Sequence, residues 1–482
     1  MRYNAVFITM RLAFTIFLLF IVSFASSAQS RQQQKVDSVF NLVKKYFNQK
    51  NADAIYNMAG ADFQKDLNID AFSEVAGKQL FTLGQIRESS LISFVNNSVA
   101  TYKLRFDMIT MQLLMSLDAH DKLQLFLFQE YVEPVGDKTA LVRTSNPLRS
   151  DIDKKIDSAA RTYIQKSNTV GLCIGIIDKD KVSTYGYGET VKGNGKIPNG
   201  DNFFELGSIT KSFTAILLAY YADEKKVKLT DSITKYLPDS VAANPELKSI
   251  TLLNLINHTS GLDRIPANLF SHATDAHNPY KDYTKQLLYS YLKTCKLSSK
   301  PGTQYAYSNL AVGLLGDILE TINKEFYEQQ VKEIICRPLG MLNTSQFLNP
   351  LLSPRFVQVY NAGGEATPPW DFDVLAACGA LRSTMNDMLL YAKANLHPGA
   401  DKLSKAIELT HHITFNKDVK VGMAWHVITV NGVDYIFHNG GTNGSSSFLA
   451  FNTEKNIAVV VLSNAAESTD KLGADILKKL VD

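Results

Sequence analysis

A serine and a lysine three residues apart could together perform nucleophilic chemistry in this chain. Ser208 and Lys211 lie in the stretch FFELGSITKSFTAILL, residues 203–218. Apolar residues recur at helical spacing after Ile209, so we predict a buried helix that begins near this residue. Positions three apart share one face of a helix, and a lysine among apolar neighbours is partly desolvated. Such a lysine can accept the serine's proton.

A helix cap is the simpler interpretation of Ser208 alone, because serine is favoured just before a helix. The pattern S-x-x-K is also common by chance in a chain with 50 lysine and arginine residues. The catalytic interpretation therefore depends on further polar groups elsewhere in the chain.

A tyrosine and an asparagine form the second polar motif. Tyr307 and Asn309 stand just before a predicted helix over residues 310–321, where a turn can direct both side chains into a cleft. The tyrosine can exchange protons with Ser208 and a leaving group, and the asparagine can bind a substrate amide. Taken alone, this turn is better explained as a helix cap.

A histidine and two glycines form the third motif, between two predicted strands. The run FHNGGTNG contains His438, Gly440 and Gly441. Glycines let a substrate lie against the strand edge, and the N–H of Gly441 can point at a developing oxyanion. A plain glycine-rich hairpin explains the glycines but does not explain the histidine before them.

The elements that must position these motifs indicate one antiparallel sheet built from both ends of the region after residue 150. Strands are predicted over residues 171–189, with a turn at 178–181, and over 421–430, 433–439, 445–453 and 456–464. Helices at 153–167 and 472–481 and a long helical middle complete the pattern. We therefore predict an α/β sandwich with a helical insert.

With its three motifs in this order, the region from about residue 151 to 482 resembles the class C β-lactamases and penicillin-binding D,D-peptidases. The sequence segments that carry the resemblance are ELGSITKSFT, HTSGL, YSNLAVGLLG and HNGGTNG. The resemblance implies a β-lactamase/transpeptidase-like fold and an acyl-enzyme on Ser208, with Lys211 and Tyr307 as proton carriers. It implies an oxyanion hole from the N–H groups of Ser208 and Gly441, and no metal or organic cofactor. The other motif residues would bind substrate, namely Asn309, His438, Gly440 and Gly441.

His438 departs from the family's pattern, which usually has lysine at this place. A histidine with an ordinary pKa of about 6.5 is largely neutral at neutral pH, which weakens recognition of a β-lactam carboxylate. The resemblance to members with histidine here implies a peptide, amide or ester substrate. We expect a hydrolase of D-amino-acid peptides, amides or esters, with activity on anionic substrates rising toward pH 6. A true class C-like β-lactamase and a penicillin-binding receptor or scaffold without turnover remain as alternatives.

The remaining polar candidates do not add a metal site. His411 and His412 are adjacent on a predicted helix, so they point apart and we expect both to be exposed. Asp263 and Arg264 follow the HTSGL turn and either edge the cleft or form a surface ion pair. The four cysteines lie far apart, without the close spacing of a metal site.

Residues 1–28 have the layout of a secretory signal peptide. Arg2 and Arg11 precede an apolar run over residues 12–24, and small residues end at Ala28. The run is shorter than the roughly 20 residues of a spanning helix, so we predict cleavage, a periplasmic or secreted product, and no transmembrane span in the mature chain. Losing two arginines lowers the net charge from +3 to +1, which argues against a nucleic-acid partner.

Residues 33 to about 142 carry no catalytic signature. An amphipathic helix over residues 36–49 precedes predicted strands at 101–109, 122–136 and 139–144. This arrangement resembles the small cone-shaped α+β domains of the nuclear-transport-factor-2-like type. We predict an accessory α+β domain over 29–146, for which the sequence names no protein partner, and a serine hydrolase domain over 147–482.

Overall fold

The computed structural model divides the chain into two units, Met1–Val132 and Glu133–Asp482. The predicted signal peptide lies outside the residues that the structure describes. Across those residues, none of the helices has the length and apolar character needed to cross a membrane. The described residues are 31–95, 98–106, 109–131, 142–270, 273–275 and 277–481.

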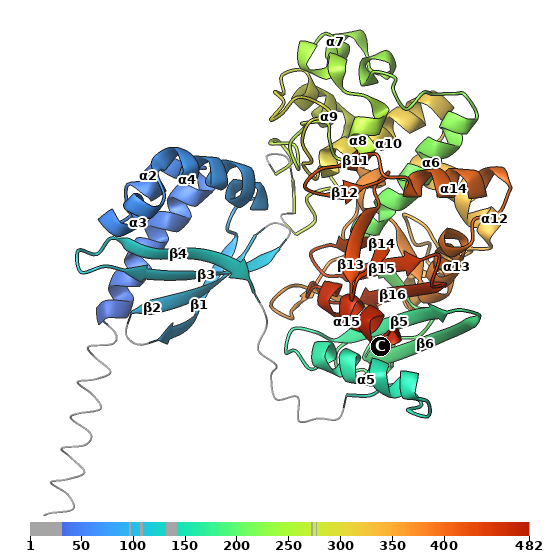
Figure 1. Cartoon of the computed structure of the whole chain (residues 1–482), viewed down its shortest axis with the longest axis horizontal. Helices are drawn as coiled ribbons and strands as arrows, with labels where there is room; N and C mark the ends of the chain where they lie inside the picture. Colours follow the sequence, from blue (N-terminus) through green and yellow to red (C-terminus); the bar gives the residue numbers. More distant parts are fainter. Residues whose placement is uncertain are drawn as a thin grey trace, which may run out of the picture. The chain divides into compact units, whose positions relative to one another are not determined.

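A helix and a four-stranded antiparallel sheet share one apolar core in the first unit (Figure 1). Residues 31–48 are helical, and the apolar face predicted for this helix packs into the core. Three short helices follow before the sheet, α2 (Ala52–Tyr56), α3 (Ala61–Asp66) and α4 (Ile69–Val75). The strands pair in chain order as β1 (Glu88–Val95), β2 (Val99–Arg105), β3 (Thr110–Leu117) and β4 (Leu123–Glu130).

The sequence identified β2 and β4 but missed β1 and β3. Strand β1 is an edge strand with little burial on either face, and β3 reads TMQLLMSL, which lacks the β-branched alternation of a typical strand. The predicted strand at 139–144 was wrong for its described part. Thr144 forms only an isolated bridge to Tyr187, whereas residues 139–141 lie outside the described residues.

An eight-stranded antiparallel sheet forms the centre of the second unit, as the sequence predicted. Its order is β11-β12-β13-β14-β15-β16-β5-β6, so strands from the two ends of the unit meet where β16 pairs with β5. The central strands read as continuous apolar runs because helices cover both faces. The bounds of the eight strands are β5 (Gly171–Asp178), β6 (Lys181–Gly188), β11 (Phe415–Asn416), β12 (Lys420–Val421), β13 (His426–Val430), β14 (Val433–Gly441), β15 (Ser446–Asn452) and β16 (Ile457–Ser463).

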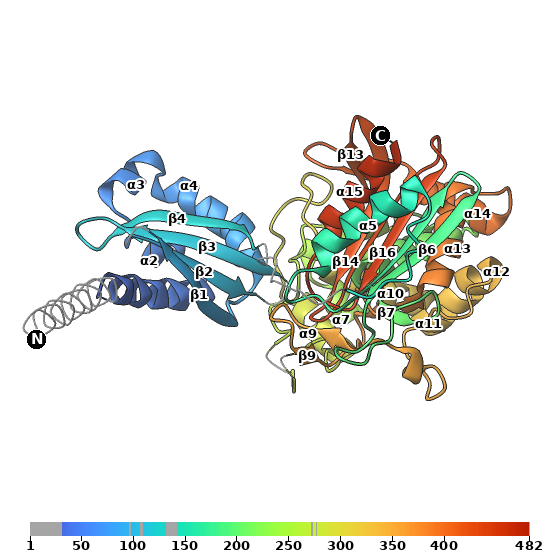
Figure 2. The ribbon, with the colours of Figure 1, turned by 90° about the horizontal axis from the view of Figure 1, so that it is seen from below.

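Two terminal helices of the second unit cover the same face of this sheet (Figure 2). They are α5 (Asp151–Ile164) and α15 (Asp470–Val481). On the opposite face α13 (Met385–Leu396) packs so closely that a methyl group on Gly175 would lie 2.4 Å from the sulfur of Met385. All four cysteines are buried as free thiols within the described residues.

The helical insert supplies the elements that position the motifs. Strand β7 (Phe203–Glu205) pairs with β10 (Arg382–Thr384) and leads into α6 (Thr210–Asp223). Helix α6 is buried around nearly its whole circumference, which is why its sequence is apolar on all sides. Helices α8 (Leu252–Ile256) and α10 (Asn309–Asn323) lie next to it.

Candidate active site

Ser208 lies in a tight 3-10 turn, Gly207–Ile209, between β7 and α6. Gly207 has φ +51°, and a methyl group there would lie 2.7 Å from the backbone nitrogen of Gly441. Both the backbone conformation and the close approach therefore require glycine at this position. In the described part of the chain no side chain caps α6, so the helix-cap interpretation of Ser208 was wrong.

Lys211 is fully buried and makes three short contacts. Its Nζ lies 2.9 Å from Ser208 Oγ, 2.8 Å from Asn309 Oδ1 and 2.6 Å from the carbonyl oxygen of Cys378. The amide and carbonyl oxygens can only accept hydrogen bonds. An amine that donates its two N–H groups to these oxygens keeps its lone pair for the hydroxyl proton of Ser208. The arrangement thus suits Lys211 to accept that proton.

Tyr307 is half-buried between two basic side chains. Lys211 Nζ lies 4.9 Å, and the guanidinium carbon of Arg264 5.0 Å, from the centroid of its ring. Arg264 therefore edges the site. Asp263 does not pair with it, because its Oδ2 accepts a hydrogen bond from the hydroxyl of Tyr291 at 2.6 Å.

Asn309 is the first residue of α10, and both ends of its amide already have partners. Its Oδ1 accepts from Lys211, and its Nδ2 donates to the Tyr280 hydroxyl at 3.1 Å. Tyr280 packs in turn against Trp370 and Phe372, with ring centroids 5.1 and 4.7 Å away. In this structure Asn309 holds Lys211 in place, and its buried oxygen is not free for a substrate.

His438 lies on β14 and is buried beside the other motifs. Its Nδ1 lies 2.6 Å from the carbonyl oxygen of Asn439. Because a carbonyl only accepts, Nδ1 carries the proton and Nε2 is left as an acceptor in the neutral ring. Burial, with smaller effects from His426 and Lys211, holds the pKa of His438 well below its ordinary value. The imidazole is therefore neutral near pH 6, and our expectation of an anchor that titrates there was wrong.

This lowered pKa changes the expected pH dependence of activity. A histidine whose pKa lies well below 6.5 gains no proton when the pH falls from 7.5 to 6. We therefore expect the ratio of kcat/KM for an anionic substrate to that for its neutral amide to stay constant, within about twofold, over this range. Steady-state assays of the matched pair at half-unit intervals check it, and a ratio that rises fivefold or more toward pH 6 would contradict it.

Gly440 brings the end of β14 against the Ser208 turn. A methyl group on Gly440 would lie 2.1 Å from the carbonyl oxygen of Leu206 and 2.9 Å from the nitrogen of Ser208. Ser447 on the neighbouring strand donates to the same carbonyl at 2.7 Å. This contact brings the backbones of Ser208 and Gly441 together, as an oxyanion hole formed by their N–H groups needs.

Glu205 is a site residue that the sequence reasoning missed. It is buried, and its Oε1 accepts a hydrogen bond from the backbone N–H of Trp370 at 2.7 Å. Its Oε2 accepts from the hydroxyls of Thr442 and Ser445 at 2.8 and 3.0 Å. Burial raises the pKa of this carboxyl. Glu205 thus ties the strand before Ser208 to the turn after Gly441, and the available signal was an acid ending an apolar strand, FFE.

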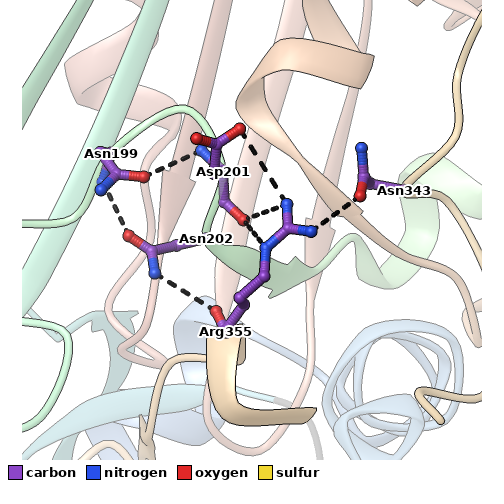
Figure 3. A pocket seen from close by; sticks show the side chains of 5 residues that line it. All are labelled: Asn199, Asp201, Asn202, Asn343 and Arg355. Atoms are coloured by element: carbon purple, nitrogen blue, oxygen red, sulfur yellow. Dashed lines mark hydrogen bonds and ion pairs between the residues drawn. The ribbon is translucent and has the colours of Figure 1, made fainter. Parts of the chain in front are cut away.

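A polar cluster fixes the chain just before β7 (Figure 3). Arg355 donates through Nε and Nη2 to the carbonyl oxygen of Asp201 at 2.9 and 2.7 Å, and through Nη1 to Asn343 at 2.9 Å. Its guanidinium also lies 4.9 Å from the ring centroid of Phe203. Because its donors are occupied by the protein itself, we interpret this cluster as structural support for β7.

His411 is half-buried, which corrects the expectation of exposure, whereas His412 is exposed. The ring of His411 lies 5.0 Å from Phe451 and 6.0 Å from Trp425, and burial lowers its pKa to about 3. Its Nε2 lies 2.9 Å from Asn395 Oδ1. It packs against the sheet, away from the motifs.

Comparisons with known proteins identify relatives of the second unit. The family model described as "Beta-lactamase" matches residues 156–481. The D-alanyl-D-alanine-carboxypeptidase/endopeptidase AmpH of Escherichia coli K12 is 31% identical over 360 residues, which cover 70% of this chain and 90% of that protein. A protein named beta-lactamase from Pseudomonas fluorescens is 24% identical, with 65% and 94% covered.

Solved structures share the fold of the second unit. A beta-lactamase/D-alanine carboxypeptidase from Pseudomonas syringae superposes with a TM-score of 0.61 at 23% identity, covering 69% of this chain and 99% of that one. A D-alanine carboxypeptidase AmpC from Burkholderia cenocepacia gives 0.60 at 23% identity, with 68% and 99% covered. These structural similarities show that the second unit has the β-lactamase/transpeptidase-like fold that the motifs predicted.

Proposed function

The chain belongs to the beta-lactamase family of serine hydrolases, and from this premise we propose that it forms an acyl-enzyme on Ser208. One observation carries the proposal. The fully buried Lys211 places Nζ 2.9 Å from Ser208 Oγ, while its other two contacts are oxygens that can only accept. This geometry favours transfer of the serine proton to the lysine as Oγ attacks a carbonyl carbon.

The proposed reaction has two halves. In the first, Oγ bonds to the carbonyl carbon, Lys211 takes the hydroxyl proton, and the N–H groups of Ser208 and Gly441 donate to the oxyanion. The intermediate collapses as the C–N or C–O bond to the leaving group breaks, and Tyr307 passes a proton to that group. In the second half, water attacks the acyl carbon and Tyr307, which gave up its own proton, takes the water's proton. The bond between the acyl carbon and Oγ then breaks, Lys211 returns its proton to Oγ, and the acid leaves. Each oxyanion donor of this kind is typically worth about 10²- to 10³-fold in rate.

The proposed substrates are D-amino-acid peptides, amides or esters. A neutral His438 supplies a hydrogen-bond acceptor where the family's usual lysine supplies a fixed positive charge, so binding does not depend on a substrate carboxylate. The relative AmpH is named a D-alanyl-D-alanine-carboxypeptidase/endopeptidase, which supports a peptide substrate. His438, Gly440 and Gly441 would line the substrate side of the site, and Asn309 would hold Lys211 beside it.

Export and an accessory role for the N-terminal region complete the proposal. Residues 1–28 would be removed as a signal peptide, residues 29–146 would form the accessory domain, and residues 147–482 the hydrolase domain. All the groups that perform the proposed reaction come from the hydrolase domain.

Active-site labelling tests this function. The purified protein is incubated with a fluorescent penicillin and with a fluorophosphonate, and the modified peptide is mapped by mass spectrometry. We expect the fluorophosphonate label on Ser208, together with turnover of a D-alanyl peptide amide or an ester. A label on another residue, or none with either reagent, would contradict the proposal. Labelling by penicillin without turnover of any substrate would favour the receptor alternative, and rapid cephalosporin hydrolysis would favour the β-lactamase.

A further inference from the structure

His258 contacts the turn that carries Tyr307 in three places. It follows α8, in the HTSGL stretch. Its backbone carbonyl accepts the N–H of Ala306 at 2.8 Å, and its Nδ1 accepts the N–H of Ser308 at 3.2 Å. Its ring lies 4.3 Å, centroid to centroid, from the ring of Tyr307. The residues on both sides of Tyr307 and the phenol itself are thus held by one residue.

The hydrogen bond from Ser308 fixes the state of the His258 ring. A nitrogen that accepts an N–H carries no proton, so the neutral ring bears its hydrogen on Nε2. Burial is the main cause that keeps the pKa of His258 well below its ordinary value, and His426, Lys211, His438 and Arg264 add to it. Nε2 is buried and has no hydrogen-bond partner among the described residues. Protonation of Nδ1 would break the bond to Ser308 and bury a positive charge.

The backbone of His258 is held in a conformation of high free energy. Its φ is +60°, a left-handed value that side chains other than glycine and asparagine seldom adopt. Such conformations cost about 1–3 kcal/mol and persist only where the surroundings impose them. The two N–H groups bound to His258 are such surroundings, because they require its carbonyl and its ring to face the Tyr307 turn together.

We propose that His258 is the positioning residue of Tyr307, fixing the phenol for proton transfer to the leaving group. The proposal rests on the proposed function, in which Tyr307 gives that proton. Histidine suits the place because it combines a flat ring that packs against the phenol with an acceptor within reach of the Ser308 N–H. Phenylalanine keeps the ring without the acceptor, whereas asparagine tolerates the left-handed backbone and keeps an acceptor without the ring.

Two substrates with different leaving groups separate positioning from general destabilisation. An amide needs a proton on its departing nitrogen, whereas 4-nitrophenolate leaves without one. We expect His258→Phe to lower kcat/KM on the amide, which depends on acylation and not on the later attack of water, about 10²-fold, the size of a lost general-acid contribution. On the 4-nitrophenyl ester we expect a loss below fivefold. Tyr307→Phe should show the same pattern, and the double variant should lose no more than either single variant.

His258→Asn and His411→Phe serve as companion variants. His258→Asn allows the test to proceed if His258→Phe does not fold. For this variant we expect the loss of activity on the amide to be about tenfold greater than the loss on the ester. His411→Phe replaces a histidine packed among aromatic rings on α14 (Lys402–His411), and we expect activity within twofold on both substrates.

The outcomes distinguish failure of the inference from failure of the function. Equal losses on amide and ester, or losses that multiply in the double variant, overturn the positioning role of His258 while the labelled Ser208 stands. A wild-type protein whose Ser208 takes no fluorophosphonate overturns the proposed function, and this inference falls with it.

Discussion

A Ser208→Ala variant is expected to lose covalent labelling completely and to lose about 10⁴- to 10⁶-fold in kcat. The variant removes the hydroxyl oxygen that lies 2.9 Å from Lys211 Nζ. The alanine side chain has no atom that can bond to the carbonyl carbon of a substrate. The free energy of unfolding should change by no more than about 1 kcal/mol, because Ser208 does not cap α6 and loses one partly exposed hydrogen bond. Labelling, steady-state kinetics and thermal unfolding of the same preparation check the three expectations.

Ser212→Ala is the matched control for this prediction. Ser212 lies four residues further along and is buried, with Oγ bonded to the Ile209 carbonyl at 2.7 Å and to the Tyr391 hydroxyl at 2.8 Å. Its loss leaves the Tyr391 hydroxyl without this acceptor, which costs about 1–3 kcal/mol, but leaves the nucleophile intact. We expect a less stable protein that still labels. Covalent labelling that survives in Ser208→Ala would place the nucleophile elsewhere.

The fold of the second unit could be predicted because its strands are long and its motifs are local. Strands such as β5 and β16 are buried on both faces, so their apolar runs end sharply at polar turns. The first unit was harder to predict. Strand β1 is an edge strand with few buried residues, and the Met, Leu and Gln of β3 suit a helix as well as a strand. Whether such a segment becomes a helix or a strand depends on its pairing within the complete sheet.

The sequence singled out the groups that are proposed to react, but not the groups that hold them. Ser208, Lys211 and Tyr307 stand out because their types and spacing suit one reaction. The carbonyl of Cys378 that binds Lys211 could not be foreseen, because every residue has a carbonyl and only the fold brings this one within 2.6 Å. The protonation state of His438 likewise depends on burial by distant segments, which a pKa assumed from the residue type does not contain.

Lys211→Met is expected to lower kcat/KM on an amide by about 10⁴-fold, at the upper end of general-base contributions. Methionine has a similar reach but no proton acceptor for the serine hydroxyl. It also leaves Asn309 Oδ1 and the Cys378 carbonyl without their buried donor, and each such loss costs about 1–3 kcal/mol. Part of this loss is offset because the buried amine itself no longer has to be desolvated. We therefore expect a net destabilisation of about 2–4 kcal/mol, measured by denaturant unfolding.

Lys211→Arg separates the role in proton transfer from the role in holding Asn309 and Cys378. A guanidinium donates to both oxygens, but it stays protonated and cannot accept from Ser208. We expect activity as low as in Lys211→Met, with the fluorophosphonate reaction at Ser208 slowed in both. Lys471→Met, at an exposed ion pair with Asp475, should leave activity and stability unchanged within about 0.5 kcal/mol. An arginine variant that acylates within tenfold of the wild-type rate would mean that another group takes the proton of Ser208.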